Sequence, residues 1–133
     1  MNPNYTVVAD RANHCCEYCR APEVVFNFPF EVEHIIPLCK QGKDSAANLA
    51  LACRSCNLRK GTRISGIDLN SNAEIRFFHP RQDYWNEHFR VAKESGMIRD
   101  ITSVGEITVT HLEMNSLAQI AARQLWIPLG LFP

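Results

Sequence analysis

Two Cys-x-x-Cys pairs constrain the fold of this 133-residue chain more than any other feature of its sequence. The first pair is Cys16 and Cys19, and the second is Cys53 and Cys56. Each spacing lets two thiolates bind one ion from a tight turn, and two pairs complete the tetrahedral shell of a structural Zn²⁺ site. Such an ion would join distant parts of the chain, so its binding energy would stabilise the fold.

Two cysteines lie outside these pairs. Cys15 is an alternative ligand, although Cys16 has the matched spacing to Cys19. We expect Cys39 to be a small, semi-buried residue rather than a ligand. Reduced core cysteines or a redox dithiol are the other interpretations of the pairs, and two matched pairs disfavour both.

The composition is that of a globular chain, with 46% apolar residues, 21% charged residues and no net charge. We expect one domain over residues 1–133. The N-terminus lacks a basic segment followed by an apolar one, and no apolar stretch reaches membrane-spanning length. We therefore expect a cytoplasmic protein without membrane contact, in which the thiols stay reduced.

The charge is unevenly spread. Between Lys40 and Arg63 there are six basic residues and a single acid, Asp44. This segment is either a patch that faces nucleic-acid phosphates or a solvated helix face, and the charge pattern alone does not separate the two.

Hydrophobic patterning predicts a mixed α+β fold. In the first half we expect the following elements: a helix over 6–13, strands over 24–28, 30–36 and 49–52, and a helix over 54–60. Gly61 is placed to end that helix.

In the second half, a helix, or a helix that runs into a strand, follows Pro80. Residues 107–112 are expected to form a strand. Asn115 or Ser116 caps a last helix, which Pro128 stops. One stripe of that helix carries Leu117, Ile120, Ala121 and Leu125.

Polar residues accompany the cysteine pairs in a fixed order. Glu33-His34-Ile35-Ile36-Pro37 lies on a predicted strand between the pairs, and Gly42 and Asn48-Leu49 follow it. Cys53-x-x-Cys56-Asn57-x-x-Lys60-Gly61 closes the pattern, which begins with Arg11 and Cys16-x-Tyr18-Cys19. Over about residues 11–61 this order resembles the zinc-containing branch of the HNH endonuclease family.

The resemblance implies a ββα-metal (His-Me finger) core over about residues 11–66, with a C-terminal α/β extension over about 75–133. The stretch from His79 to about Arg123 is similar to the tail of one group of small bacterial HNH proteins. That match rests on Pro80, Trp85, His88-Phe89, Gly105 and Thr108-Val109.

The resemblance also implies a metal-dependent hydrolysis of DNA phosphodiester bonds. His34 would be the general base that takes a proton from water. Asn48 would hold the loop by bonding the backbone near His34. Glu33 and Asn57 would bind the catalytic ion, and their oxygen ligands favour Mg²⁺ or Mn²⁺.

DNA is the expected partner, double-stranded or single-stranded, and the protein is expected to be a monomer or a homodimer. Four basic residues around the second cysteine pair are candidates for phosphate contact: Arg54, Arg59, Lys60 and Arg63.

We expect His79, His88 and His111 to pack or to contact substrate, with His88 the strongest candidate for an additional active-site residue. Trp85, Phe77 and Phe78 are expected in the core. A non-catalytic zinc module that binds nucleic acid, and an RNA-cleaving nuclease on the same core, are the alternative functions.

Overall fold

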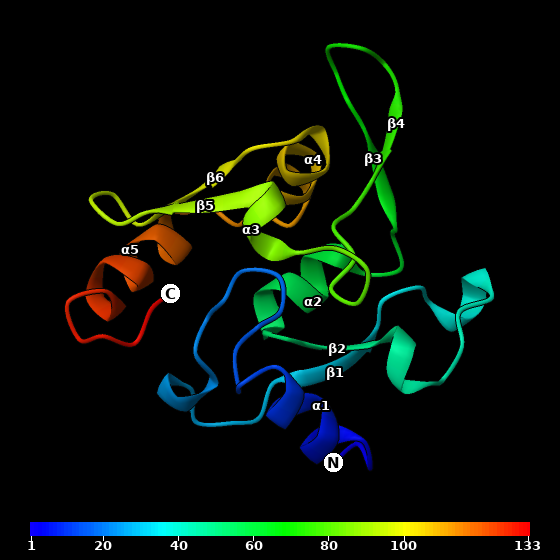
Figure 1. Ribbon diagram of the computed structural model, residues 1–133, viewed down its shortest axis with the longest axis horizontal. Coiled ribbons are helices and arrows are strands. Elements are labelled where there is room, and N and C mark those ends of the chain that lie inside the picture. Colours follow the sequence, from blue (N-terminus) through cyan, green and yellow to red (C-terminus); the bar gives the residue numbers. More distant parts are fainter.

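The first half of the chain forms a hairpin and a helix, and the second half packs on the other side of that helix (Figure 1). The computed structural model describes all 133 residues. Its helices are α1 (Tyr5–Arg11), α2 (Arg54–Lys60), α3 (Trp85–His88), α4 (Ser103–His111) and α5 (Leu117–Trp126). Its strands are β1 (Glu31–His34), β2 (Leu49–Ala52), β3 (Ser65–Ile67), β4 (Glu74–Arg76), β5 (Phe89–Ala92) and β6 (Met97–Asp100).

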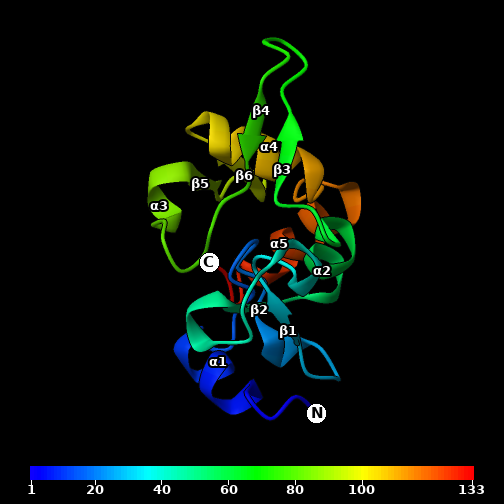
Figure 2. The ribbon, with the colours of Figure 1, turned by 90° about the vertical axis from the view of Figure 1, so that its right-hand side faces the viewer.

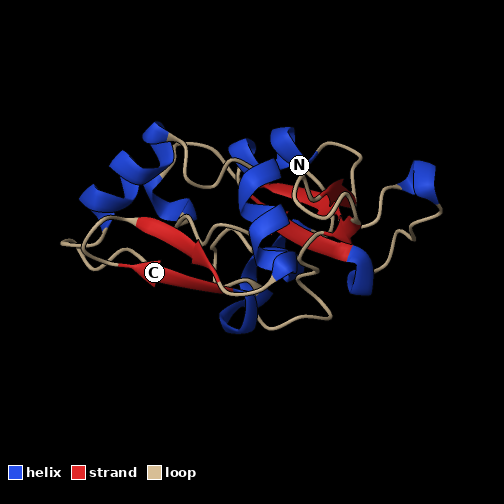
Figure 3. Ribbon diagram, turned by 90° about the horizontal axis from the view of Figure 1, so that it is seen from above, coloured by secondary structure: helices blue, strands red, loops and turns tan.

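The strands form three separate antiparallel pairs rather than one sheet. In Figure 3 the β5–β6 pair, on the left, lies apart from the other strands. In the first pair, His34 lies opposite Leu49 and Glu31 lies opposite Ala52. All four residues of β2 are buried. This explains why that strand has an uninterrupted apolar sequence instead of alternating apolar and polar residues.

Helix α2 follows β2 after a single residue and has the bounds that the sequence predicts. Cys53 caps its N-terminus, where the Cys53 sulfur accepts a hydrogen bond from the Cys56 backbone N–H. Gly61 ends it with φ of +55°, a conformation that glycine adopts without a steric penalty. The β1–β2–α2 unit is therefore encoded locally.

The C-terminal half contains two hairpins and two longer helices. The β3–β4 ribbon projects away from the rest of the molecule (Figure 2). The β5–β6 pair packs against α4, which also contacts β3 and β4. None of the helices has both the length and the apolar composition that a membrane span requires.

One cluster of 22 buried residues joins the two halves. Trp85 belongs to it, and its indole N–H donates to the Tyr18 carbonyl oxygen at 2.7 Å, inside the first cysteine turn. Phe77 and Phe78 also lie in this core, as predicted. The extension thus packs directly on the cysteine-containing turn.

Two predicted strands were wrong. Residues 24–28 contain a 3₁₀ turn, Glu23–Val25, in place of a strand. Residues 107–112 lie mostly in α4, where Thr102 caps the N-terminus and the Thr108 hydroxyl donates to the Val104 carbonyl oxygen. Capping and this internal bond outweigh the β-propensity of the sequence.

The predicted strand over 30–36 is shorter, at Glu31–His34, and the predicted helix over 6–13 is α1. After Pro80 the chain forms a helix that runs into a strand, α3 and β5, which is one of the two predicted alternatives.

The last helix has its expected cap, because the Ser116 hydroxyl accepts from the Gln119 backbone N–H. The face of this helix that was predicted to be apolar is not the buried face, however. Leu117 and Leu125 are exposed, and the buried residue of α5 is Arg123.

Candidate metal centre and active site

Four cysteine side chains converge at the junction of the two halves. The sulfur atoms of Cys16, Cys19, Cys53 and Cys56 lie within 4.8 Å of one another, and all four residues are buried. The Cys19 and Cys53 sulfurs are 3.7 Å apart. Tetrahedral zinc with Zn–S bonds of about 2.3 Å needs sulfur atoms about 3.8 Å apart. The cluster therefore fits a structural zinc site.

The two unpaired cysteines lie outside this cluster. Cys15 is half-buried and does not join the four sulfurs. Cys39 is exposed, which corrects the expectation that it is semi-buried.

A buried guanidinium supports an anionic zinc–thiolate centre. Arg123 is completely buried, and it donates to the Gly96 carbonyl oxygen at 2.6 Å and to Asn115 Oδ1 at 3.1 Å. Its Nη1 atom has no partner. Burial lowers the pKa of Arg123, and the charges of thiolates including Cys19 and Cys53 oppose this. Four thiolates around a bound Zn²⁺ would carry a net negative charge, which would offset the buried cation.

His34 is the last residue of β1 and lies at the protein surface. Its side chain is 26% exposed, and its Nε2 atom is 3.0 Å from Asp44 Oδ1. Asp44 belongs to the loop between β1 and β2. Asp44 was not among the predicted site residues. Its position as the single acid in a basic segment could have suggested a functional role.

Asn48 ties this loop to the end of β1. Its Oδ1 accepts from the Ile36 N–H at 2.9 Å, and its amide donates to the carbonyl oxygens of Ile36 and Lys43 at 2.9 and 2.8 Å. Gly42 lies in the same loop, where a Cβ atom would come 1.7 Å from the Ile36 carbonyl oxygen. The loop that carries Asp44 is therefore held in place by Asn48, which bonds to Ile36 before the loop and to Lys43 within it.

The Glu33 side chain is buried in the protein interior, whereas the side chain of the neighbouring His34 is partly exposed. Its carboxylate accepts from the buried Tyr18 hydroxyl, and Lys60 Nζ lies 3.1 Å from the other oxygen. Burial raises the pKa of Glu33, while the charge and hydrogen bonds of Lys60 and Tyr18 oppose that rise. Both carboxylate oxygens of Glu33, which was expected to bind the catalytic ion together with Asn57, therefore have protein partners. Glu33 connects β1 to α2.

Lys60, expected to contact phosphate, is buried in this structure. Its side chain is 2% exposed, and its ammonium donates to Glu33 Oε2 and to the carbonyl oxygens of His34 and Ile35. These contacts use its three N–H donors. Lys60 therefore holds α2 against the end of β1, where His34, the expected general base, is located.

The arginines around α2 do not form one patch. Arg59 pairs with Glu113, and Arg63 donates to His111 Nδ1 at 2.9 Å. Arg54 is exposed and lines the cavity between α2 and α5 together with Arg59. Of these three arginines, only Arg54 has a guanidinium without an ion pair or hydrogen bond to the protein.

Asn57 is half-buried on α2, one turn before Lys60. No residue bonds its side-chain amide, so its oxygen is available as a ligand. His88, expected as the additional active-site candidate, has its Nδ1 atom 2.6 Å from the Thr102 hydroxyl. That contact places it in the packing of the extension.

A two-stranded hairpin followed by a helix, with a four-cysteine clamp at the helix N-terminus, defines the class of zinc-stabilised ββα-metal proteins with an α+β extension. The family model described as HNH endonuclease matches residues 16–63. Over these residues the chain is similar to HNH endonucleases, a family of nucleases. Searches of curated proteins and of solved structures found no match.

Proposed function

We propose that this protein is a metal-dependent endonuclease that hydrolyses DNA phosphodiester bonds with His34 as general base. The observation that carries the proposal is the contact between His34 Nε2 and Asp44 Oδ1 at 3.0 Å, on a partly exposed imidazole. A carboxylate that accepts the Nε2 proton leaves Nδ1 as the basic nitrogen of the neutral ring.

Nδ1 would take a proton from water and direct the resulting hydroxide at phosphorus. The imidazolium formed in this step is stabilised by the negative charge of Asp44. Asp44 and Asn48 act as positioning residues, because one orients the ring and the other fixes the loop that supplies the carboxylate. Neither needs to touch the reacting atoms.

A hard divalent cation, Mg²⁺ or Mn²⁺, would supply charge stabilisation for the pentavalent phosphate and the leaving 3′ oxygen. Asn57 is the proposed protein ligand, since its amide oxygen has no other partner. Arg54 is the proposed phosphate contact among the four basic candidates. Because one chain has one such centre, it would cut one strand, and a double-strand break would require a homodimer or two encounters.

The experiment compares zinc-loaded protein on supercoiled plasmid, single-stranded DNA and RNA, with Mg²⁺, with Mn²⁺ and without added divalent cation. We expect plasmid nicking that depends on the cation and leaves 5′-phosphate and 3′-hydroxyl ends. Binding to DNA without cleavage under any cation would contradict the proposal and favour the non-catalytic zinc module. Cleavage of RNA alone would favour the RNA-directed alternative.

A further inference from the structure

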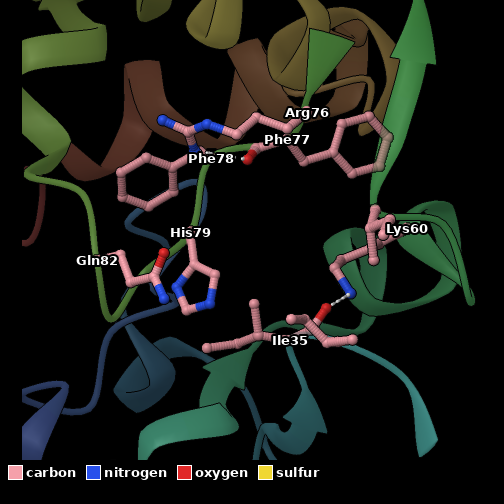
Figure 4. A pocket seen from close by; sticks show the side chains of 9 residues that line it. Ile35, Lys60, Arg76, Phe77, Phe78, His79 and Gln82 are labelled. Atoms are coloured by element: carbon pink, nitrogen blue, oxygen red, sulfur yellow. Dashed lines mark hydrogen bonds between the residues drawn. The ribbon is translucent and has the colours of Figure 1, made fainter. Parts of the chain in front are cut away.

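A cavity of 220 Å³ lies between the residues that follow β1, helix α2 and the segment that follows β4 (Figure 4). Its lining includes Ile35 and Ile36, which directly follow His34 in the chain. Phe77, Phe78, His79 and Gln82 supply the opposite side, and Ile64 lies at the edge. The proposed function does not use this cavity.

The walls of the cavity are rigid and mainly apolar. Phe77, Phe78 and Ile35 are each at most 4% exposed, so their positions are fixed by the core. Rigid aromatic and aliphatic walls with a few polar groups are typical of sites for small organic ligands. The volume of 220 Å³ is smaller than that of pockets for drug-sized molecules, which indicates a single-ring or double-ring group.

Both cations at the cavity are already neutralised. Lys60 is paired with Glu33 and bonded to two carbonyl oxygens. Arg76 donates to both oxygens of Asp83, at 2.6 and 3.0 Å. Because neither retains an unpaired charge, the cavity favours a neutral ligand over a phosphate or carboxylate.

Two polar groups remain available. His79 Nδ1 accepts from the Arg81 backbone N–H at 3.2 Å, which places the proton of the neutral ring on Nε2. Burial lowers the pKa of His79, in agreement with a neutral ring. His79 Nε2–H and the side-chain amide of Gln82 have no partner in the protein. Together they offer donors and an acceptor to the edge of a planar ligand.

We propose that this cavity binds one unstacked nucleobase of the nucleic-acid substrate, close to the phosphate that His34 addresses. This inference rests on the proposed function for its choice of ligand class. A nucleobase combines a flat apolar face with a hydrogen-bonding edge and carries no charge. The site would require the substrate to be locally unpaired, which favours single-stranded, nicked or distorted DNA over a regular duplex.

The test measures binding of short single-stranded DNA to zinc-loaded protein without added divalent cation, so that nothing is cleaved. A set of oligonucleotides carries one abasic position, moved along the strand. Ile64→Trp fills the edge of the cavity, and Leu69→Trp is the matched control because Leu69 is 95% exposed on the distant turn of the β3–β4 ribbon. Gln82→Ala removes one polar group from an exposed side chain.

We expect one abasic position to weaken binding by wild-type protein about 5-fold to 150-fold, the range for loss of one stacked base. Ile64→Trp should weaken binding of the intact strand similarly and remove the sensitivity to that position. Gln82→Ala should weaken binding about 2-fold to 10-fold. Leu69→Trp should bind like wild type.

Equal affinity of wild type and Ile64→Trp for the intact strand would overturn the inference, and so would a scan with no sensitive position. If Ile64→Trp does not fold, wild-type affinity of Gln82→Ala for the intact strand would overturn the inference instead. Cleavage is measured separately. A sensitive position without cleavage under any cation would contradict only the proposed nuclease, whereas cleavage without a sensitive position would contradict only the base site.

Discussion

The ammonium of Lys60 lies 3.1 Å from the Glu33 carboxylate, and both side chains are almost completely buried. The pair joins the strand that ends at His34 to the helix that carries Asn57. Burying two charges costs free energy that their attraction only partly offsets, so such a pair contributes orientation more than stability. Burial raises the pKa of Glu33 despite its two partners, which agrees with this cost.

Lys60→Met should therefore destabilise the protein by about 3–5 kcal/mol, because it leaves the Glu33 carboxylate buried without its cation. The double variant Glu33→Gln with Lys60→Met should recover much of this loss. Urea unfolding of both variants measures the free energy of unfolding. If the free energy of unfolding of Lys60→Met lies within about 1 kcal/mol of the wild-type value, the pair is not buried as described.

Glu33→Gln alone distinguishes a positioning residue from a metal ligand. If Glu33 positions α2, the variant should lower the cleavage rate while the Mg²⁺ concentration for half-maximal rate stays unchanged. If that concentration rises tenfold or more, Glu33 is a ligand, as the family pattern implies. Leu58→Gln on the exposed side of α2 is the control for general effects on the helix.

Gly42→Ala should disrupt the loop beside His34. The added Cβ would come 1.7 Å from the Ile36 carbonyl oxygen, so the backbone has to move away from the Asn48 side chain. We expect a loss of about 1–3 kcal/mol, with a larger fractional loss of cleavage. Ser45→Ala, at an exposed position of the same loop, should behave like wild type, and equal effects of both variants would contradict this account.

These residues show what the sequence predicts and what it does not. The bounds of β2 and α2 follow from a buried apolar run, a cap and a terminal glycine, all of which are local features. The cysteine cluster follows from spacing. The partners of Glu33, Lys60 and Arg123 depend on which faces meet in three dimensions, and a charged residue in a sequence is ordinarily expected at the surface.

Arg123→Met should weaken zinc binding. The substitution removes the buried cation that offsets the thiolate charge, and loss of such outer interactions costs 10-fold to 100-fold in metal affinity. Arg123→Lys keeps the charge and should retain more of the affinity. Competition with a chromophoric chelator measures zinc affinity directly, and wild-type affinity in Arg123→Met would exclude this role.

Stability near the N-terminus should depend on pH through Glu23. Burial by itself raises the pKa of Glu23, but hydrogen bonds from the Phe30 N–H, Tyr5 and His14 outweigh it and lower the pKa below the ordinary 4.5. A lowered folded-state pKa means that this carboxylate stabilises the fold above pH 4.5 and loses its contribution as the pH falls through the folded-state value.

His14 acts in the opposite direction. Hydrogen bonds to Glu23 and Asp10 raise its pKa above the ordinary 6.5, so its contribution is present below pH 6.5 and is lost as the pH rises through the folded-state value. The stability difference between wild type and Glu23→Gln should therefore be largest between about pH 4.5 and 6.5. Urea midpoints across a pH series test this, and a difference that grows below pH 4 would contradict it.

The single-turnover nicking rate of His34→Ala on supercoiled plasmid, under saturating Mg²⁺ or Mn²⁺, tests the central claim most directly. The variant should fold, should hold one zinc ion per chain, and should lose at least 100-fold in rate, because a general base contributes about 10²–10⁴-fold. A zinc-loaded variant that nicks as fast as wild type would contradict the assignment of His34 as the base.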